Sequence, residues 1–285
     1  MGVIRGIKTV LTGKPAIEGA GVHLKRAFGN SEAPLFDPFL LLDDFHSDTP
    51  ADYVRGFPWH PHRGIETITY VLNGEIDHGD SMGNKGIIQS GDIQWMTAGS
   101  GIIHQEMPVD QRQGLLWGFQ IWTNLPSSHK MMPPRYRDVK SGQIPRVVTD
   151  HGVTVKIICG EFNGTEGPVR DIVTAPEYLD IAVPPESQFR YATNRGRTVL
   201  AYVMEGMAHF DAERKSLSRS EHLIAFAEGD EVLVSTREKP VRFLLISGQP
   251  IKEPVAWYGP IVMNTREELK TAFEEYQNGT FLKHS

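Results

Sequence analysis

Two short motifs carry the residue types that bind transition metals. The first is His60-Pro61-His62 and the second is His104-Gln105-Glu106. Side chains two residues apart on an extended chain point to the same face, so each pair can reach one ion. Two antiparallel strands lying opposite each other would then bring three imidazoles and one carboxylate together. Such a set suits iron, manganese, nickel, copper or zinc, and it leaves two positions open on an octahedral ion.

Glu66 is a further carboxylate close to the first motif. It follows His62 by four residues, so on an undistorted strand it shares the face of the histidines. The residues leave three roles open: a metal ligand, an acceptor for an imidazole N–H, or an ion-pair partner of Arg63. His78 lies in a polar segment with turn character, and we expect its side chain to be exposed to solvent.

The elements that must position these motifs are predicted to be short β-strands. Residues 65–72 are rich in β-branched and aromatic side chains and end at Asn73-Gly74, a strong hairpin signal. Residues 93–97 and 114–125 are further apolar or aromatic strands. Many short strands at roughly ten-residue spacing predict an antiparallel sandwich or barrel.

One helix is predicted, near the end of the chain. Thr265 and Glu268 have the spacing of a capping box, in which each side chain bonds to the other residue's backbone N–H. An apolar stripe at helical spacing follows, formed by Leu269, Ala272, Phe273 and Tyr276. Asn278-Gly279 is a typical helix end. We expect this helix to be structural, with its stripe packed against the strands.

The length of 285 residues predicts two domains, because a typical domain has about 150 residues. A proline-rich stretch at residues 131–136 is the natural start of a linker, which we extend to about residue 143. The expected domains are therefore residues 1–143, with the candidate metal site and the start of the linker, and residues 144–285.

An internal repeat supports this division. Three segments recur in the same order, the first two at an offset of 132 residues and the third at a slightly larger one: Tyr70–Gly74 with Tyr202–Gly206, Arg63-Gly64 with Arg195-Gly196, and Gly91-Asp92 with Gly229-Asp230. Two copies of one β fold are the simplest explanation of the repeat.

The second copy lacks the candidate ligands. Ala192 and Asn194 stand at the positions of His60 and His62. Residues 241–244, near the offset expected for His104, contain neither histidine nor a carboxylate. The sequence therefore predicts a metal site in the first copy and a degenerate second copy.

Composition and charge exclude several classes of function. The net charge is −6, and no long block of lysine and arginine is present, which disfavours direct binding of nucleic acid. A single cysteine, Cys159, rules out an intramolecular disulfide and is expected to be a buried core residue. No segment reaches the roughly 18 apolar residues of a membrane span, and no secretory signal is visible. We expect a soluble cytoplasmic protein. If the source is a eukaryote, the nucleus is a second expected location.

The motifs resemble those of the cupin superfamily, and one branch matches in detail. The pattern His60-x-His62-x3-Glu66-x7-Gly74 is similar to the first cupin motif, whereas the second is matched loosely, with Thr97 in place of its proline. Pirins, a cupin branch, have the signature HPHRG-ET followed by GD-QWMTAG-GI-H-EMP, which residues 60–67 and 91–108 meet. Residues 258–265 also resemble the pirin ending, so the resemblance covers essentially the full length.

This resemblance implies an all-β fold of two tandem cupin domains, each an antiparallel β-barrel, with a short C-terminal helix. It implies that His60, His62, His104 and Glu106 hold one divalent transition metal, and that Glu66 supports the site without binding the ion. Iron(II) is the expected metal, although manganese, nickel, copper, cobalt or zinc would fit the same donors.

The resemblance also implies an activity, because pirins are similar to quercetin 2,3-dioxygenases. The expected reaction opens a flavonol-like ring with O₂, with Glu106 accepting the proton of the substrate hydroxyl. Phe57 and Trp59 are expected either as walls of the substrate pocket or as core residues. A cupin isomerase or lyase is disfavoured, since no cluster of arginine and lysine lies near the ligands.

A non-enzymatic function is the alternative. Pirins are also known as nuclear cofactors of transcription factors, with the oxidation state of iron acting as a switch. The chain would then be an iron-dependent redox-sensing adaptor for a protein partner, either a transcription factor or a metabolic enzyme. Neither function requires direct contact with nucleic acid or a membrane.

Overall fold

The computed structural model describes residues 2–109 and 114–283. They form two compact units, and each unit combines two separate stretches of the chain. We call them the histidine unit, made of Lys14–Ser141 and Ile251–Ser285, and the second unit, made of Met1–Gly13 and Gly142–Pro250.

This division differs from the single boundary predicted after residue 143. The break in the middle of the chain lies close to the predicted place, but each terminal segment belongs to the unit formed by the other half. The N-terminal strand β1 (Ile7–Thr12) pairs with β21 (His222–Phe226), which explains why residues 1–13 belong to the second unit. A local sequence pattern carries no information about such distant pairing.

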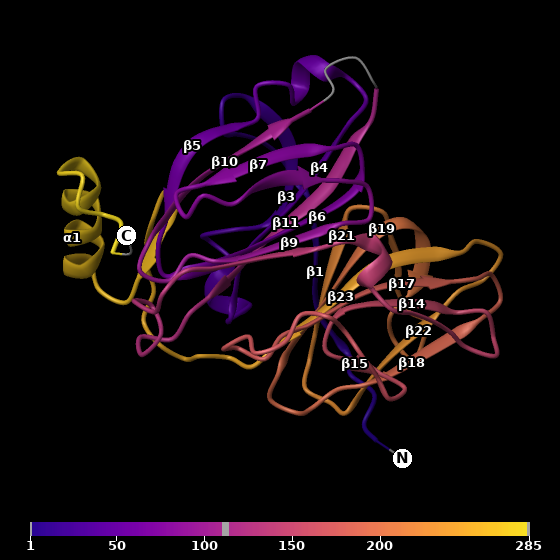
Figure 1. The fold of residues 1–285 in the computed structure, drawn as a ribbon. Helices are drawn as coiled ribbons and strands as arrows, with labels where there is room; N and C mark the ends of the chain where they lie inside the picture. The colour runs from indigo at the N-terminus through magenta and orange to yellow at the C-terminus, as the bar shows by residue number, and fades with distance from the viewer. Residues whose placement is uncertain (1, 110–113, 284–285) are drawn as a thin grey trace. The chain divides into compact units, whose positions relative to one another are not determined.

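Two antiparallel sheets build the histidine unit (Figure 1). The strands of the larger sheet are β2 (Lys14–Glu18), β3 (Val22–Phe28), β4 (Phe39–Ser47), β6 (Ile65–Asn73), β9 (Ile93–Thr97), β11 (Leu116–Asn124) and β12 (Arg135–Val139). The strands of the smaller sheet are β5 (Phe57–His62), β7 (Ile76–Asp80), β8 (Lys85–Ile88) and β10 (Ile102–Pro108). Their orders are β12-β9-β6-β11-β4-β3-β2 and β5-β10-β7-β8.

β12 lies where the sequence predicted a linker. It pairs residue by residue with β9, from Arg135 opposite Thr97 to Val139 opposite Ile93. The two prolines at residues 133–134 come just before the strand, where a missing N–H costs no ladder hydrogen bond. The proline-rich stretch therefore marks the start of a strand that completes the larger sheet.

The second unit has the same topology. Its strands are β1, β13 (Arg146–Val148), β14 (Thr154–Cys159), β17 (Glu177–Val183), β18 (Gln188–Ala192), β19 (Thr198–His209), β20 (Leu217–Arg219), β21, β22 (Glu231–Ser235) and β23 (Val241–Gly248), with a small hairpin of β15 (Glu161–Phe162) and β16 (Thr165–Glu166). The order β1-β21-β19-β23-β17-β14-β13 repeats that of the larger sheet, with β19 in the places of both β6 and β7. The predicted duplication is confirmed.

The strand pairings correct one part of the predicted repeat. The N–H of Gly91 bonds to the carbonyl of Val71, and its counterpart in the second unit is the N–H of Glu221 bonded to the carbonyl of Val203. Gly91-Asp92 therefore corresponds to the turn before β21, not to Gly229-Asp230. The counterpart of β10 is accordingly β22, which pairs with β18, and not residues 241–244 in β23.

The core of the second unit is filled with apolar side chains. Phe243 contacts Phe189 and Phe210 edge to face, within a large buried cluster of apolar residues. Cys159 is buried, as predicted. This packing fits a unit that keeps the fold without keeping the ligand positions.

The C-terminal segment of the histidine unit contains a small hairpin and the helix. These elements are β24 (Ala256–Tyr258), β25 (Ile261–Met263) and α1 (Arg266–Gln277). The predicted capping box is confirmed, since Thr265 Oγ1 accepts from the N–H of Glu268 at 3.1 Å and Glu268 Oε2 accepts from the N–H of Thr265 at 3.0 Å. Ala272 of α1 is buried in the cluster that contains Ile261 and Phe281.

The hairpin of this segment is bonded to the junction between β5 and β6. The N–H of Val262 donates to the carbonyl of Arg63 at 3.1 Å. The buried ammonium of Lys130 donates to the carbonyls of Gly64 and Val262 at 2.9 and 3.0 Å, and Arg63 donates to the carbonyl of Phe281 at 2.7 Å. The hairpin and Phe281 thus hold the turn that directly follows the first histidine motif.

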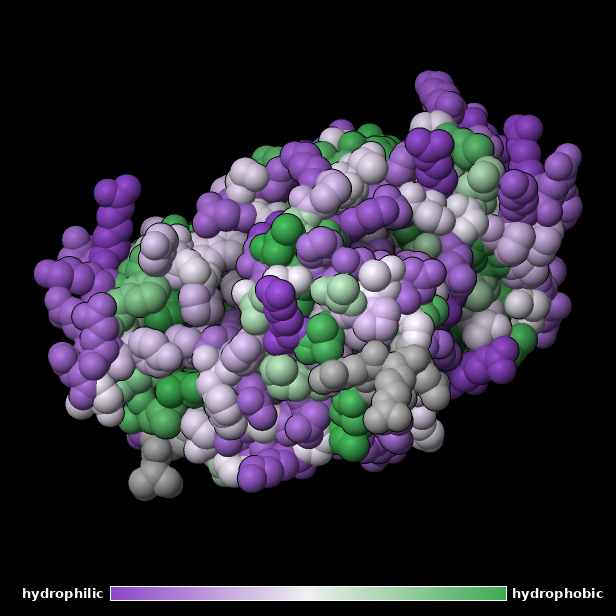
Figure 2. Space-filling view, turned by 90° about the horizontal axis from the view of Figure 1, so that it is seen from above, coloured by the Kyte–Doolittle hydropathy of each residue, from purple (hydrophilic) through white to green (hydrophobic). Residues whose placement is uncertain are grey.

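Three short 3₁₀ helices complete the described elements: η1 (Ala33–Leu35), η2 (Pro50–Asp52) and η3 (Ser141–Gln143). Among residues 2–109 and 114–283, no helix has the length and hydrophobicity needed to cross a membrane. On the face drawn in Figure 2, hydrophobic side chains form several small patches separated by hydrophilic ones. Scattered exposed apolar residues of this kind are ordinary on protein surfaces.

Candidate metal centre

The pairing of β5 with β10 brings the histidines of the two motifs together. His60 lies opposite His104 in the antiparallel register, and His62 lies opposite Ile102. The ring centroid of His104 lies 4.4 Å from that of His60 and 5.0 Å from that of His62. One nitrogen from each of the three rings lies within 4.8 Å of the others, a spacing at which they could share one ion.

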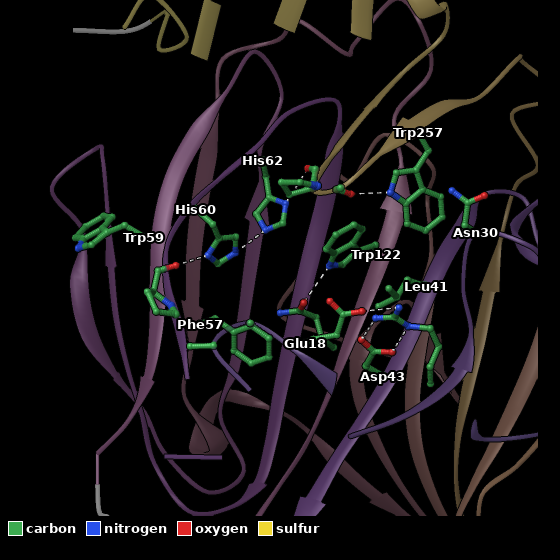
Figure 3. Close-up of a pocket in the computed structure, with 17 residues that line it drawn as sticks. Glu18, Asn30, Leu41, Asp43, Phe57, Trp59, His60, His62, Trp122 and Trp257 are labelled. Atoms are coloured by element: carbon green, nitrogen blue, oxygen red, sulfur yellow. Dashed lines mark hydrogen bonds and ion pairs between the residues drawn. The ribbon is translucent and has the colours of Figure 1, made fainter. Parts of the chain in front are cut away.

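Two of the three rings are oriented by backbone carbonyls. His60 Nδ1 donates to the carbonyl of Pro58 at 2.8 Å, and His62 Nδ1 donates to the carbonyl of Pro260 at 3.0 Å. A carbonyl oxygen only accepts, so Nδ1 carries the proton in both rings and Nε2 keeps its lone pair. The two Nε2 atoms face each other at 3.1 Å, as Figure 3 shows. This is the orientation that metal-binding histidines adopt.

Burial keeps the cluster neutral and ready for a cation. His104 has no exposed surface, and within the described part of the chain neither of its ring nitrogens has a hydrogen-bond partner. Burial lowers the pKa of His60, and it holds the pKa values of His62 and His104 well below their usual range. Unprotonated imidazoles and an orphaned buried nitrogen fit a bound metal ion.

In the metal-free protein, we expect stability to fall as the pH drops below 6.5. The unfolded chain protonates His62 and His104 near their ordinary pKa of 6.5, whereas the folded state resists protonation. The unfolded state therefore binds more protons, and the unfolding free energy decreases by roughly 2 kcal/mol between about pH 6.5 and 5.5. Urea unfolding at both pH values measures this change. The double variant His62→Gln/His104→Gln should lose most of it, and equal stability of the parent protein at both values would contradict the expectation.

Glu106 lies outside the histidine cluster of the described residues. Its buried carboxylate accepts from Thr69 Oγ1 at 2.8 Å and from Gln120 Nε2 at 3.1 Å. The amide of Gln120 is oriented in turn, because its oxygen accepts from Trp122 Nε1 at 3.0 Å. Glu106 follows His104 by two residues on β10, but its role as a fourth ligand stays a prediction.

Glu66 does not share the face of the histidines. Thr97 and Thr123, its neighbours across β9 and β11, donate to its carboxylate at 2.6 and 3.4 Å. Alternation along β6 puts Thr69, which bonds to Glu106, on the opposite face. The strand is not continuous from His62, because the backbone turns at Gly64 with a φ of +77°. The expectation of a shared face was therefore wrong.

Arg63 is also not paired with Glu66. Its guanidinium forms an ion pair with Glu275 of α1 at 2.7 Å and lies over the ring of Phe281 at 4.2 Å. The carboxylate of Glu66 lies 3.9 Å from Arg135 instead. Burial raises the pKa of Glu66. The structure thus joins Arg63 to the C-terminal segment and Glu66 to β12.

His78 is buried and not exposed as expected. Its exposed fraction is 1%, its ring stacks on Tyr136 with centroids 4.8 Å apart, and it lies 5.5 Å from the ring of His104. The polar segment Asp77-His78-Gly79-Asp80 belongs to β7, which pairs with β10 in the smaller sheet. Strand pairing, which the local composition does not reveal, places this histidine beside the cluster.

A cavity of about 610 Å³ opens beside His60 and His62. Phe57, Trp122 and Trp257 contribute to its wall, and the ring of Trp122 meets His62 edge to face at 5.1 Å. Figure 3 shows Trp122 between His62 and Trp257.

Trp59 also belongs to the lining of the cavity, as one of the two expectations had it, and it is not a core residue. Its side chain is 52% exposed and lies over Gly79, and Figure 3 shows it turned away from His60 and His62. Phe57 is partly buried and contributes to the wall of the cavity, as one of the two expectations had it.

Comparison with known proteins identifies the family. Residues 21–123 match the Pirin family, and residues 178–282 match the Pirin C-terminal cupin domain. A pirin-like protein of Caulobacter vibrioides is 43% identical over 98% of this chain and 99% of its own length. The chain belongs to the pirin family. A Pseudomonas aeruginosa protein with the provisional name quercetin 2,3-dioxygenase is 42% identical over 96% of this chain and 97% of its own.

A solved structure has the same fold. The quercetin 2,3-dioxygenase of Acinetobacter baumannii superposes with a TM-score of 0.90 at 30% identity, over 98% of both chains. The expected fold class, two cupin domains with one short C-terminal helix, is confirmed.

Several residues around the cluster were missed by the sequence reasoning. Thr69 and Gln120 bond to Glu106, and Pro260 orients His62. Alternation along residues 65–72 and 114–125 was a usable signal for Thr69 and Gln120, since both lie on the inner face of predicted strands. No local pattern connects Pro260 with a motif 198 residues earlier.

Proposed function

We propose that this pirin is a metal-dependent dioxygenase that opens a flavonol-like ring with O₂. The proposed metal ligands are His60, His62, His104 and Glu106, and the proposed ion is iron(II). Two similar proteins support the reaction, since the A. baumannii protein is named a quercetin 2,3-dioxygenase and the P. aeruginosa protein carries that name provisionally.

The observation that carries the proposal is the position of the cluster in the cavity. His60 and His62 form part of a wall that also contains the indoles of Trp122 and Trp257, whose centroids are 5.8 Å apart. A volume of about 610 Å³ lies in the range of small-molecule sites, and aromatic walls suit a flat aromatic ligand. A substrate bound there would lie directly against His60 and His62, two of the four proposed ligands.

A bound ion would supply Lewis acidity that lowers the pKa of a substrate hydroxyl. The chain supplies the base for that proton. Each oxygen of Glu106 already accepts one hydrogen bond, from Thr69 or from Gln120, and keeps a second lone pair. These two donors hold the carboxylate in one conformation, so the base is already oriented before the substrate binds.

The test is anaerobic mixing of iron-loaded protein with quercetin, followed by admission of air. We expect a change of the flavonol spectrum on binding, and loss of the flavonol together with oxygen uptake only after air enters. Metal-free protein and His62→Ala serve as controls and should leave the flavonol intact. Iron-loaded protein that binds quercetin without consuming oxygen would contradict the proposal and leave the adaptor function as the better explanation.

A further inference from the structure

His104 differs from the other two cluster histidines in what lies behind its ring. His60 and His62 donate to backbone carbonyls through Nδ1. His104 has no such carbonyl among the described residues, and both of its nitrogens are buried without a hydrogen-bond partner. The imidazole of His78 lies beside it instead, with its centroid 5.5 Å from that of His104 and the two rings tilted by 56°.

His78 is held firmly beside His104. It lies on β7, the neighbour of β10, and stacks on Tyr136 with an interplanar angle of 16°. Both of its ring nitrogens are buried and without a hydrogen-bond partner in the described structure. Its Nε2 lies 3.6 Å from Asp80 Oδ2, the nearest contact of its polar atoms to an acid.

The carboxylate of Asp80, which a His78 N–H could reach, is held in place by hydrogen bonds. Its Oδ1 accepts from the backbone N–H groups of Met82 and Asn84 at 2.9 and 3.0 Å, and its Oδ2 accepts from Asn84 Nδ2 at 2.8 Å. These donors hold the carboxylate in place whether or not His78 contacts it.

In the row of side chains His104, His78 and Asp80, the hydrogen-bond donors and acceptors match in number. A neutral imidazole has one donor and one acceptor nitrogen. An ion takes the acceptor nitrogen of His104, so the remaining N–H needs an acceptor. His78 provides one if its own N–H points to Asp80. A buried donor without a partner is unfavourable, so the arrangement in which His78 accepts this N–H is favoured once the ion is bound.

We propose that His78 is a positioning residue for the metal: it accepts the N–H of His104 and donates to Asp80. A buried carboxylate then stands behind one of the three imidazole ligands and makes that ring a stronger electron donor. The inference rests on the metal-binding part of the proposed function and not on the oxidation of a flavonol.

The first test compares His78→Phe with His78→Gln. Phenylalanine keeps the stacking on Tyr136 but removes the acceptor, whereas glutamine keeps one acceptor and one donor. We expect His78→Phe to weaken zinc(II) binding 10- to 100-fold in a chelator competition, and His78→Gln to restore most of the affinity. A tenfold loss selective for iron(III) over iron(II) would also raise the reduction potential by about 59 mV.

His209→Phe is the matched control. His209 is a buried histidine of the second unit, with Nδ1 bonded to the carbonyl of Ser216. Its substitution should leave zinc affinity unchanged. Unchanged affinity and potential in His78→Phe, or equal losses in the Phe and Gln variants, would overturn the inference. If the parent protein binds no metal at all, the proposed function fails instead.

A second measurement needs no variant and so does not depend on the folding of His78→Phe. In zinc-loaded protein with ¹⁵N-labelled histidine, we expect a scalar coupling across the hydrogen bond between a nitrogen of His104 and one of His78. The N–H signals of His60 and His62, which donate to carbonyl oxygens, should lack such a coupling. A resolved His104 N–H without coupling to His78 would overturn the inference.

Discussion

Glu106→Gln is expected to lower the turnover of a flavonol by 10²- to 10⁴-fold, the usual loss when a general base is removed. Glutamine has nearly the same shape but cannot accept the proton of the substrate hydroxyl. The substitution should be tolerated, since the hydroxyl of Thr69 can rotate to accept from the new amide while Gln120 continues to donate. Steady-state kinetics per bound iron, with iron content measured on the same sample, gives the change.

Glu66→Gln is the matched control for this variant. Glu66 is as deeply buried as Glu106, but it lies on the opposite face of β6, where Thr97 and Thr123 bind its carboxylate. Its turnover per bound iron should stay within a few-fold of the parent protein. A Glu106→Gln protein that retains iron and turns over at the parent rate would disprove the assignment of the base.

Gly64→Ala is expected to give the largest loss of stability among single substitutions near the site. At a φ of +77° an L side chain is strained by itself, and a Cβ atom there would lie 2.0 Å from the carbonyl oxygen of Val262. The backbone of the hairpin would have to move, which breaks the bonds from Val262 to Arg63 and from Lys130 to Gly64. We expect a loss of about 3–5 kcal/mol in unfolding free energy.

Gly83→Ala separates the two contributions to this loss. Gly83 has a similar φ of +88°, but a Cβ atom there would meet no other atom within 4 Å. Its substitution should therefore cost only the backbone strain, about 1–2 kcal/mol. Urea unfolding of both variants gives the comparison. Equal losses would show that the hairpin yields easily and that Gly64 is needed only for its backbone conformation.

Much of the site could be predicted because its information is local. The spacing in His60-Pro61-His62 and the presence of a second motif at His104 were sufficient to predict the cluster that the structure contains. The capping box at Thr265 was equally local. Within each motif and within the capping box, the residues lie within four positions of one another, where strand or helix geometry fixes the relation. The approach of the two motifs depends on the pairing of β5 with β10.

The parts that could not be predicted depend on pairing between distant segments. The turn at Gly64 restarts the alternation of side chains, so Glu66 faces away from His62 despite its even spacing. His78 is buried by β10 and by Tyr136, which its own polar segment does not reveal. The counterpart of His104 in the second unit was misplaced because a sequence offset does not show which strands pair.

The exchange of terminal segments has a consequence for how the site is made on the ribosome. Residues 251–285 are synthesised after all the other strands of the histidine unit, yet they provide the Pro260 carbonyl that orients His62. A nascent chain that has both histidine motifs therefore still lacks the contacts that fix the cluster. We therefore expect the three histidines to reach their final arrangement only after translation has passed the final hairpin, so a truncated chain would carry both motifs without the Pro260 contact that orients His62.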